Sequence, residues 1–268
     1  MVKPSTNMTA IYKLTNVNYN YGTTIALHDL SLTLNSGKFY GIVGPNGCGK
    51  TTLLDLLVGS KTPATGSVQF LEKSLAEYSK RQLAQQVALV PQEFEIGFDY
   101  TVEELVLMGR HPYIPRFGTP SAEDMALVDE AMRVIGIDHF GTRLVTELSG
   151  GEKQRVVVAR ALAQDTPVLL FDEATSNLDV RYTLQIFNGV KSRVQSDGRT
   201  VIAVIHNLNL AAAYCDELIF MEQGHIRQMG SVEEVLTAAT IQAVFGVDAS
   251  VKYNDFSKAT QVAYRYGK

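Results

Sequence analysis

Hydrophobic positions follow two different patterns along the chain. Over residues 11–34 they alternate loosely with polar positions, as in half-buried antiparallel strands, and Gly22-Thr23-Thr24 predicts a turn between two such strands. Further along, apolar residues gather into short runs without alternation, each followed by a helical pattern. Such runs indicate the strands of a parallel sheet that helices cover on both faces. The runs are residues 39–43, 87–90, 168–171 and 200–205.

The middle of the chain changes character. Within residues 93–146, two helical patterns at 102–109 and 122–135 are separated by a loop with two prolines. We interpret this segment as a helical lobe inserted into one domain that spans residues 1–268. Its predicted parts are a core at 10–92 and 147–230, the lobe at 93–146, and a tail at 231–268 with two short helices at 232–239 and 240–245.

Composition and charge exclude several classes of protein. Hydrophobic residues make up 46% of the chain and charged residues 19%, which is an ordinary globular balance. The net charge of −4 argues against nucleic acid as a partner, because backbone binding requires a basic excess. No apolar run reaches the ~20 residues that cross a bilayer, and the N-terminus does not resemble a signal peptide. Cys48 and Cys215 predict neither a disulfide framework nor a metal site, and we expect a reducing cytosol.

The first candidate for chemistry is a glycine-rich loop between a predicted strand and a predicted helix. Gly44 to Thr51 matches the pattern G-x-x-x-x-G-K-[ST] in the setting that this pattern requires. The glycines let backbone N–H groups surround an anion, and the helix that opens at Lys50 adds its positive dipole end. Lys50 supplies a charge for the outer phosphates, and the Thr51 hydroxyl is suited to Mg²⁺. The loop therefore predicts a nucleoside triphosphate site.

Two acids follow the apolar run at 168–171. Asp172 and Glu173 come just beyond the carboxyl end of a buried strand, where open α/β sheets bind their ligands. Asp172 is suited to the Mg²⁺ shell, and Glu173 to polarising a water as general base. Acids also end strands without any function, but a phosphate loop in the same chain favours the metal-and-base interpretation.

The stretch from Leu148 to Arg155 reads Leu-Ser-Gly-Gly-Glu-Lys-Gln-Arg. Ser149 is a good N-cap, and Ser149 and Glu152 have the spacing of a capping box. An ordinary capped helix does not explain Gly150-Gly151 in the first turn, where each glycine costs about 1 kcal/mol relative to alanine. Two bare glycines suit a helix end whose backbone an anion approaches closely. We therefore predict a second phosphate-binding helix terminus.

With this stretch the chain resembles the nucleotide-binding subunit of an ABC transporter, because the Leu-Ser-Gly-Gly-Glu signature separates that family from other phosphate-loop proteins. The resemblance extends from about Tyr12 to Val247. It implies an α/β fold: a phosphate-loop NTPase core with a mixed, largely parallel sheet, an N-terminal antiparallel β subdomain and an inserted helical subdomain. It also implies an ATPase that uses ATP and Mg²⁺.

The resemblance gives roles to four further residues. Gln92 matches the glutamine that touches Mg²⁺ and the attacking water, and His206 matches the histidine that contacts the γ-phosphate and orients the catalytic glutamate. Asp179 is the acid of Ser176-Asn177-Leu178-Asp179, which resembles the loop along the dimer seam. Tyr21 matches the aromatic that stacks on adenine, a contact worth ~1–3 kcal/mol in other base-binding sites. A core tyrosine on a strand remains the alternative for Tyr21.

The resulting candidate site has four parts. The catalytic residues are Glu173, His206 and Gln92, and the Mg²⁺ ligands are Thr51, Gln92 and Asp172. The ATP-binding residues are Tyr21, Gly44, Pro45, Asn46, Gly47, Cys48, Gly49, Lys50, Thr51 and Thr52. The signature residues Ser149, Gly150, Gly151 and Glu152 would contact the ATP held by a second copy, with Asp179 in the seam.

Some segments resemble one branch of the family. Leu105–Tyr113 and His206–Ala211 are similar to importers of iron–siderophore, haem and vitamin B12, a group that includes molybdate and tungstate importers. This implies a homodimer bound to two membrane-spanning permease subunits at the cytoplasmic face of the cell membrane, and indirectly to an extracytoplasmic solute-binding protein. The segment from Gln92 to about Phe117 is the candidate docking surface, with a solvated loop as the alternative.

Two other functions compete with transport. A soluble ABC ATPase of an assembly complex, such as iron–sulfur cluster assembly, would share the whole catalytic set, although the Gly109–Tyr113 segment favours the importer. A DNA-repair or chromosome-type ABC protein would carry a long heptad coiled coil between the phosphate loop and the signature, and this chain has none there.

Overall fold

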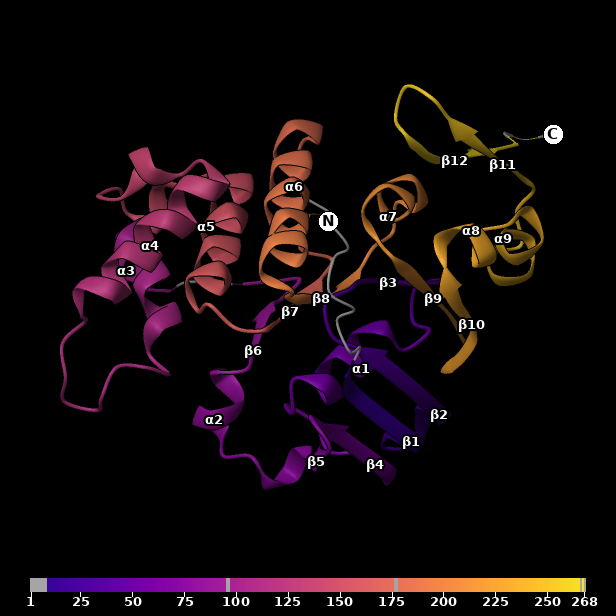
Figure 1. Ribbon diagram of the computed structural model, residues 1–268, viewed down its shortest axis with the longest axis horizontal. Helices are drawn as coiled ribbons and strands as arrows, with labels where there is room; N and C mark the ends of the chain where they lie inside the picture. The colour runs from indigo at the N-terminus through magenta and orange to yellow at the C-terminus, as the bar shows by residue number, and fades with distance from the viewer. Residues whose placement is uncertain (1–8, 95–96, 176–177, 266, 268) are drawn as a thin grey trace, which may run out of the picture. The chain divides into compact units, whose positions relative to one another are not determined.

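The computed structural model describes residues 9–94, 97–175, 178–265 and 267 (Figure 1). They belong to two compact units, one formed by residues 1–78 with 204–268 and the other by residues 79–203. Each unit has its own strands and helices. The phosphate loop lies in the first unit, and the signature helix lies in the second.

The first unit begins with the antiparallel sheet that the alternating pattern predicts. β1 (Ala10–Tyr21) and β2 (Thr24–Asn35) form a hairpin, and β4 (Thr65–Phe70) and β5 (Lys73–Ser74) extend it in the order β2-β1-β4-β5. Tyr12 is buried against the ring of Phe70, with centroids 5.0 Å apart. Its hydroxyl donates to the Leu57 carbonyl at 2.9 Å, and burial raises the pKa of Tyr12 beyond its usual range. The inward positions of this sheet thus form one core.

The strand that leads into the phosphate loop is buried along its whole length. β3 (Phe39–Val43) pairs in parallel with β9 (Glu217–Glu222), and β9 pairs antiparallel with β10 (His225–Ser231). Asp216 ties the start of β3 down, because its N–H donates to the Phe39 carbonyl and its carboxylate accepts from the Phe39 N–H, both at 2.7 Å. β9 and β10 are absent from the elements predicted above.

The helices of the first unit are α1 (Lys50–Leu57), α7 (Leu208–Tyr214), α8 (Val232–Val235) and α9 (Ala238–Phe245). The predicted boundary between the two tail helices is wrong, because Thr237 caps α9 by accepting from the Thr240 N–H at 3.1 Å. A further unpredicted element follows, the hairpin of β11 (Ala249–Asn254) and β12 (Ala259–Tyr264). In Figure 1 this hairpin lies at the yellow end of the colour scale, near α7.

The second unit is built on strands that the uninterrupted apolar runs predict. β6 (Val87–Val90) pairs in parallel with β7 (Val168–Asp172), and β8 (Thr200–Val204) follows β7 in the strand order. β7 and β8 are buried at every position. The predicted α/β class, with its N-terminal antiparallel sheet and its helical lobe, is confirmed.

The second unit also contains the helices α2 to α6, of which α3, α4 and α5 pack on one another (Figure 1). Four of its helices begin with capping boxes, at Ser79, Thr101, Ser121 and Ser149. Among the helices that the structure describes, none is both long enough and apolar enough to cross a membrane. The helices are α2 (Lys80–Ala84), α3 (Val102–Leu107), α4 (Ala122–Ile135), α5 (Gly150–Ala163) and α6 (Val180–Asp197), and short 3₁₀ turns occur at Met108–Arg110, Asp138–Phe140 and Val145–Glu147.

Gly109 and Arg110 lock the end of α3 onto the end of α5. A Cβ on Gly109 would lie 2.2 Å from the Arg160 carbonyl oxygen, so only glycine permits this approach. Arg110 is buried and donates to Asp124 at 2.8 Å and to the carbonyls of Ala163 and Gln164 at 3.0 and 3.1 Å. Gly109 and Arg110 belong to the segment Leu105–Tyr113, which resembles importers, and they stabilise the packing of the lobe helices.

Candidate functional site

The phosphate loop connects β3 to α1 and is shaped by its glycines. Gly47 and Gly49 have φ values of 76° and 101°, which side chains disfavour. A Cβ on Gly44 would lie 2.2 Å from the Met221 carbonyl oxygen, and one on Gly49 would lie 2.6 Å from that of Ala26. Gly47 faces open space among the described residues. The loop thus packs closely on neighbouring backbone at Gly44 and Gly49 and stays accessible at Gly47. A phosphate-binding loop requires such an accessible side.

Lys50 begins α1 and reaches back over this loop. Its side chain is buried, and Nζ donates to the carbonyls of Gly44 at 3.0 Å and Pro45 at 2.9 Å. The ammonium group therefore lies within the loop, next to the N–H groups that open α1. Positive charge, backbone donors and the helix dipole coincide here, and all three favour an anion.

Cys48 of the loop and Thr52 of α1 are both buried. Cys48 is buried, burial raises the pKa of its thiol, and both cysteines of the chain are free. A thiol with a raised pKa is a poor nucleophile at neutral pH. The backbone N–H of Cys48 donates to the Pro45 carbonyl at 3.4 Å, within the loop. Thr52 is also buried, and its Oγ1 lies 3.4 Å from Tyr21 Oη.

Tyr21 ends β1 and is not a core residue. It is 49% exposed, its ring meets the edge of Tyr19 at 5.1 Å, and Lys61 Nζ lies 5.4 Å from its centroid. A hydrogen bond to Asp55 holds Lys61 in place and raises its pKa. The exposed ring beside α1 is available to a planar ligand, which removes the core alternative.

The predicted acids lie at the carboxyl end of β7. Asp172 is the last residue of the strand and is only 6% exposed. Glu173 follows with φ of 50°, a left-handed conformation that is uncommon and costly for a side-chain-bearing residue. Gln92 Nε2 donates to Glu173 Oε2 at 2.9 Å, across 81 positions of sequence. The structure therefore brings Gln92, Asp172 and Glu173 together in one unit.

The signature forms the start of α5 as its sequence predicts. The Ser149 hydroxyl accepts from the Glu152 N–H, and the hydroxyl and N–H of Ser149 both donate to Glu152 Oε2 at 2.7 and 2.8 Å. These hydrogen bonds hold the pKa of Glu152 below its usual range, so this carboxylate is charged at neutral pH. Within the described residues a Cβ on Gly150 would meet nothing within 4 Å. The helix end is thus capped on one side and open on the other.

Residues that sequence reasoning missed link the signature to its surroundings. Gln154 Nε2 donates to the Ala174 carbonyl at 2.9 Å, next to Glu173. The guanidinium carbon of Arg155 lies 3.8 Å from the ring centroid of Tyr182, while its buried Nε has no partner among the residues that the structure describes. Both lie in the signature stretch, but nothing in their spacing indicates which distant residues they meet.

A pocket of about 260 Å³ opens beside this helix end, lined by residues that include Ser149, Gly151 and Tyr182. Asp179 also lines it and caps α6, accepting from the Tyr182 N–H at 3.0 Å. Asp179 therefore lies beside the signature residues. Ser176 and Asn177, the first residues of the predicted seam loop, lie outside the described residues.

His206 lies in the first unit, two residues after the end of β8. The Ile205 N–H donates to the Ile42 carbonyl of β3 at 3.1 Å, and Asn207 caps α7 by accepting from the N–H groups of Asn209 and Leu210. His206 itself is exposed. The predicted set is thus divided: the phosphate loop, Tyr21 and His206 belong to the first unit, and Gln92, Asp172, Glu173, Asp179 and the signature to the second.

Comparisons with known proteins agree on one family. The family model for the ABC transporter matches residues 27–176. The chain is 44% identical over 230 residues to a cobalamin import ATP-binding protein, BtuD, of Halobacterium salinarum; the match covers 86% of this chain but only 57% of that protein. It is 39% identical over 236 residues to a hemin import ATP-binding protein, HmuV, of Pseudomonas putida, covering 86% of this chain and 91% of that protein.

A solved structure agrees with these relatives. A metal-chelate type ABC transporter in an inward-facing conformation contains a chain that matches with a TM-score of 0.82 and 28% identity, over 97% of this chain and 98% of that one. The family match covers more than half of this chain, and the Pseudomonas putida relative is matched over 91% of its own length; the chain therefore belongs to the ABC transporter family.

Proposed function

We propose that this chain is the ATP-hydrolysing subunit of an importer for a metal chelate or related small solute. The observation that carries the catalytic part is Glu173, held in a strained backbone conformation at the end of β7 and hydrogen bonded to Gln92. Strain of this kind persists where the surrounding structure over-determines a position, and it clusters at active sites. Glu173 would take the proton of the attacking water as general base, and Gln92 would orient that water.

ATP would bind through the elements of the first unit. The exposed ring of Tyr21 would stack on adenine, and the backbone of Gly44–Thr52 with Lys50 would hold the β- and γ-phosphates. His206 would contact the γ-phosphate and orient Glu173. These roles suit side chains that are exposed at element ends, as Tyr21 and His206 are.

Mg²⁺ would be held by Thr51, Gln92 and Asp172. A hydroxyl, an amide oxygen and a carboxylate form the hard oxygen donor set that Mg²⁺ prefers, and Asp172 is a nearly buried carboxylate at a ligand-binding sheet edge. The ion, when bound, neutralises charge that develops on the transferred phosphoryl group. The chain would supply these donors from the first turn of α1, from the segment after β6 and from the last residue of β7.

Two copies of this chain would share each ATP. The open face at Ser149 and Gly150, with its helix dipole and bare backbone, would bind the γ-phosphate held by Lys50 of the second copy, and Asp179 would lie in the seam.

At concentrations where dimers are scarce, we expect ATPase activity to rise with the square of the chain concentration. Steady-state assays over a dilution series measure this, and a strictly linear dependence there would contradict the shared site.

Transport requires membrane subunits, for which the second unit offers a surface. Residues of 107–120, together with Arg81, line a pocket of about 430 Å³, and the lining includes Leu107, His111 and Arg116. Phe117 is 95% exposed. A mixed apolar and basic surface suits a short helix of a permease subunit. The chain would then work at the cytoplasmic face of the membrane, with two permease subunits and, indirectly, an extracytoplasmic solute-binding protein.

The names of two relatives refer to cobalamin import and to hemin import. We propose a cargo of the same kind for this chain: cobalamin, haem, an iron–siderophore or an oxyanion.

We expect tagged chain, extracted from its native membranes with detergent, to co-purify with a multi-span membrane protein. The Arg116→Glu/Phe117→Ala variant should recover much less of that membrane protein. Recovery with soluble cluster-assembly proteins and no membrane protein would instead favour the assembly ATPase. Binding assays on the associated solute-binding protein would then identify the cargo.

A further inference from the structure

We propose that Asn209 is a positioning residue, through which the C-terminal β11–β12 hairpin holds the His206 turn, residues 206–209, in place for hydrolysis. The inference rests on the role proposed above for His206, and it gives a function to a tail that the site does not otherwise use. All the groups involved belong to the first unit.

The central contact is a two-point pairing between a side chain and a strand. Asn209 Nδ2 donates to the Val262 carbonyl at 3.2 Å, and the Val262 N–H donates to Asn209 Oδ1 at 2.6 Å. The amide thus pairs with both backbone groups of one β12 residue, much as a neighbouring strand would. Val262 is buried, so losing this pairing would leave backbone groups poorly solvated.

The backbone of Asn209 is held as firmly as its side chain. Asn207 Oδ1 accepts from the Asn209 N–H at 2.9 Å and from the Leu210 N–H at 3.1 Å. On the other side of His206, the Ile205 N–H is bonded to β3. Leu208 packs into the core at 3% exposure. His206 therefore lies between two anchored points, and Asn209 supplies the link to the tail.

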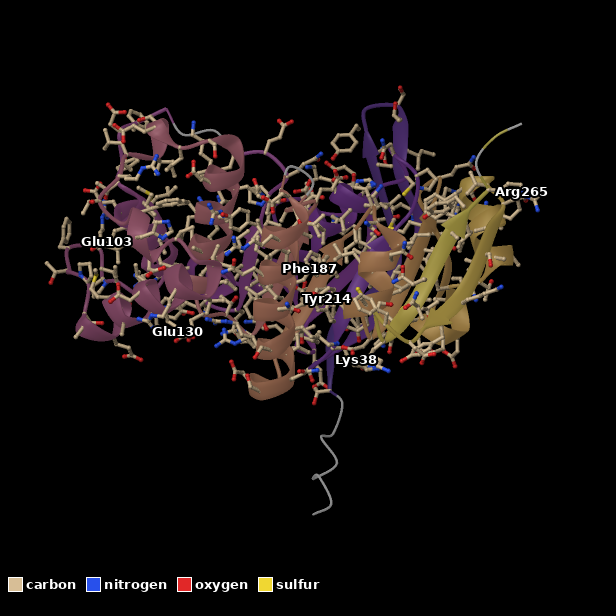
Figure 2. The ribbon with its side chains drawn as sticks, turned by 90° about the horizontal axis from the view of Figure 1, so that it is seen from above. Lys38, Glu103, Glu130, Phe187, Tyr214 and Arg265 are labelled. Atoms are coloured by element: carbon tan, nitrogen blue, oxygen red, sulfur yellow. The ribbon has the colours of Figure 1, made fainter. Side chains whose placement is uncertain are left out.

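Hydrogen bonds fix the β11–β12 hairpin both at its turn and where its two strands enter and leave. Where they enter and leave, the Arg265 N–H donates to the Asp248 carbonyl at 3.0 Å, and the Arg265 side chain, labelled in Figure 2, forms an ion pair with Asp248 at 3.1 Å. At its turn, Asn254 Oδ1 accepts from the N–H groups of Phe256 and Ser257 at 2.9 and 3.1 Å. A hairpin fixed in this way is a firm support for α7. Apolar packing alone would tolerate rotation of the first turn of α7, whereas a two-point polar contact specifies one orientation.

The test measures ATP hydrolysis by the full chain carrying Asn209→Ala, Asn209→Asp or Gln261→Ala. We expect Asn209→Ala to lower kcat about 10-fold, because displacing a catalytic group by a fraction of an ångström slows the reaction, and to change the KM for ATP less than about 2-fold. Asn209→Asp keeps the acceptor and loses the donor, so its kcat should be intermediate. Gln261→Ala is the matched control on β12, since Gln261 Nε2 donates within the hairpin, to Ser257 at 3.3 Å, and has no other hydrogen bond to the residues that the structure describes. This variant should hydrolyse ATP like the unaltered chain.

A double-mutant cycle separates positioning from general weakening. If Asn209 acts through His206, adding Asn209→Ala to His206→Ala should lower the residual single-turnover rate no further. Thermal denaturation verifies that each variant is folded at the assay temperature. An unchanged kcat in Asn209→Ala, or an equal 10-fold loss in both backgrounds, would overturn the positioning role alone. Full turnover in His206→Ala would instead contradict the proposed role of His206, and the positioning role with it.

Discussion

Replacing Glu173 by glutamine is expected to lower ATP turnover about 1,000-fold, within the range that a positioned general base contributes, while ATP binding persists. Glutamine has nearly the same shape and can still meet Gln92, which donates to Glu173 Oε2 at 2.9 Å, but it cannot accept a proton from water. The variant should therefore accumulate as a nucleotide-bound dimer. Phosphate release measures turnover, and size-exclusion chromatography with ATP measures the dimer.

Glu147→Gln is the matched control, since Glu147 is an exposed acid of the same unit. It should hydrolyse ATP like the unaltered chain, which shows that loss of a negative charge is not itself inhibitory. Near-normal turnover in Glu173→Gln would remove Glu173 from the base role and leave the strained backbone at this position without a catalytic explanation.

Replacing Lys50 by alanine is expected to weaken ATP binding by about 100-fold, equivalent to losing about 3 kcal/mol of charge-assisted contact with the phosphates. Lys50 Nζ lies within the phosphate loop, where it donates to the carbonyls of Gly44 and Pro45. Because the side chain is buried, its charge acts through little solvent and is screened less than a surface charge. Titration with a fluorescent ATP analogue measures the change in Kd.

Lys61→Ala provides the comparison, because Lys61 is a second cation of the same unit, paired with Asp55 and close to Tyr21 rather than to the loop. We expect this substitution to change the Kd for ATP less than about 3-fold, because a partly exposed ion pair contributes little. Equal losses in the two variants would mean that the loop responds to total positive charge, and the specific role of Lys50 would be wrong.

Local signals in the sequence predicted much of the local structure correctly. The cap at Ser149 and its partner Glu152 lie within one helical turn, so three residues of spacing are enough to specify them. α4 begins and ends at the predicted residues, Ala122 and Ile135, because a capping serine precedes it and a glycine at φ of 70° follows. The turn between β1 and β2 and the glycine conformations of the phosphate loop are similarly short-range features.

Other features depend on partners far away in the chain. β9 has an apolar stretch of only four residues, 218–221, and becomes a strand because β3 and β10 pair with it on either side. The β11–β12 hairpin is largely exposed and lacks a strong hydrophobic period, so only its mutual pairing and its contact with α7 define it. Boundaries in the tail were wrong for the same reason: short helices depend on what they pack against.

The sequence by itself thus determined the family, the phosphate loop and the capped signature helix, since a short contiguous motif carries each of them. Only the tertiary structure decided three hydrogen bonds: Gln92 to Glu173, Gln154 to the Ala174 carbonyl, and Val262 to Asn209. These contacts join residues 81, 20 and 53 positions apart. A side chain carries no local mark of a partner at that distance, because the partner is chosen by the packing of whole strands and helices.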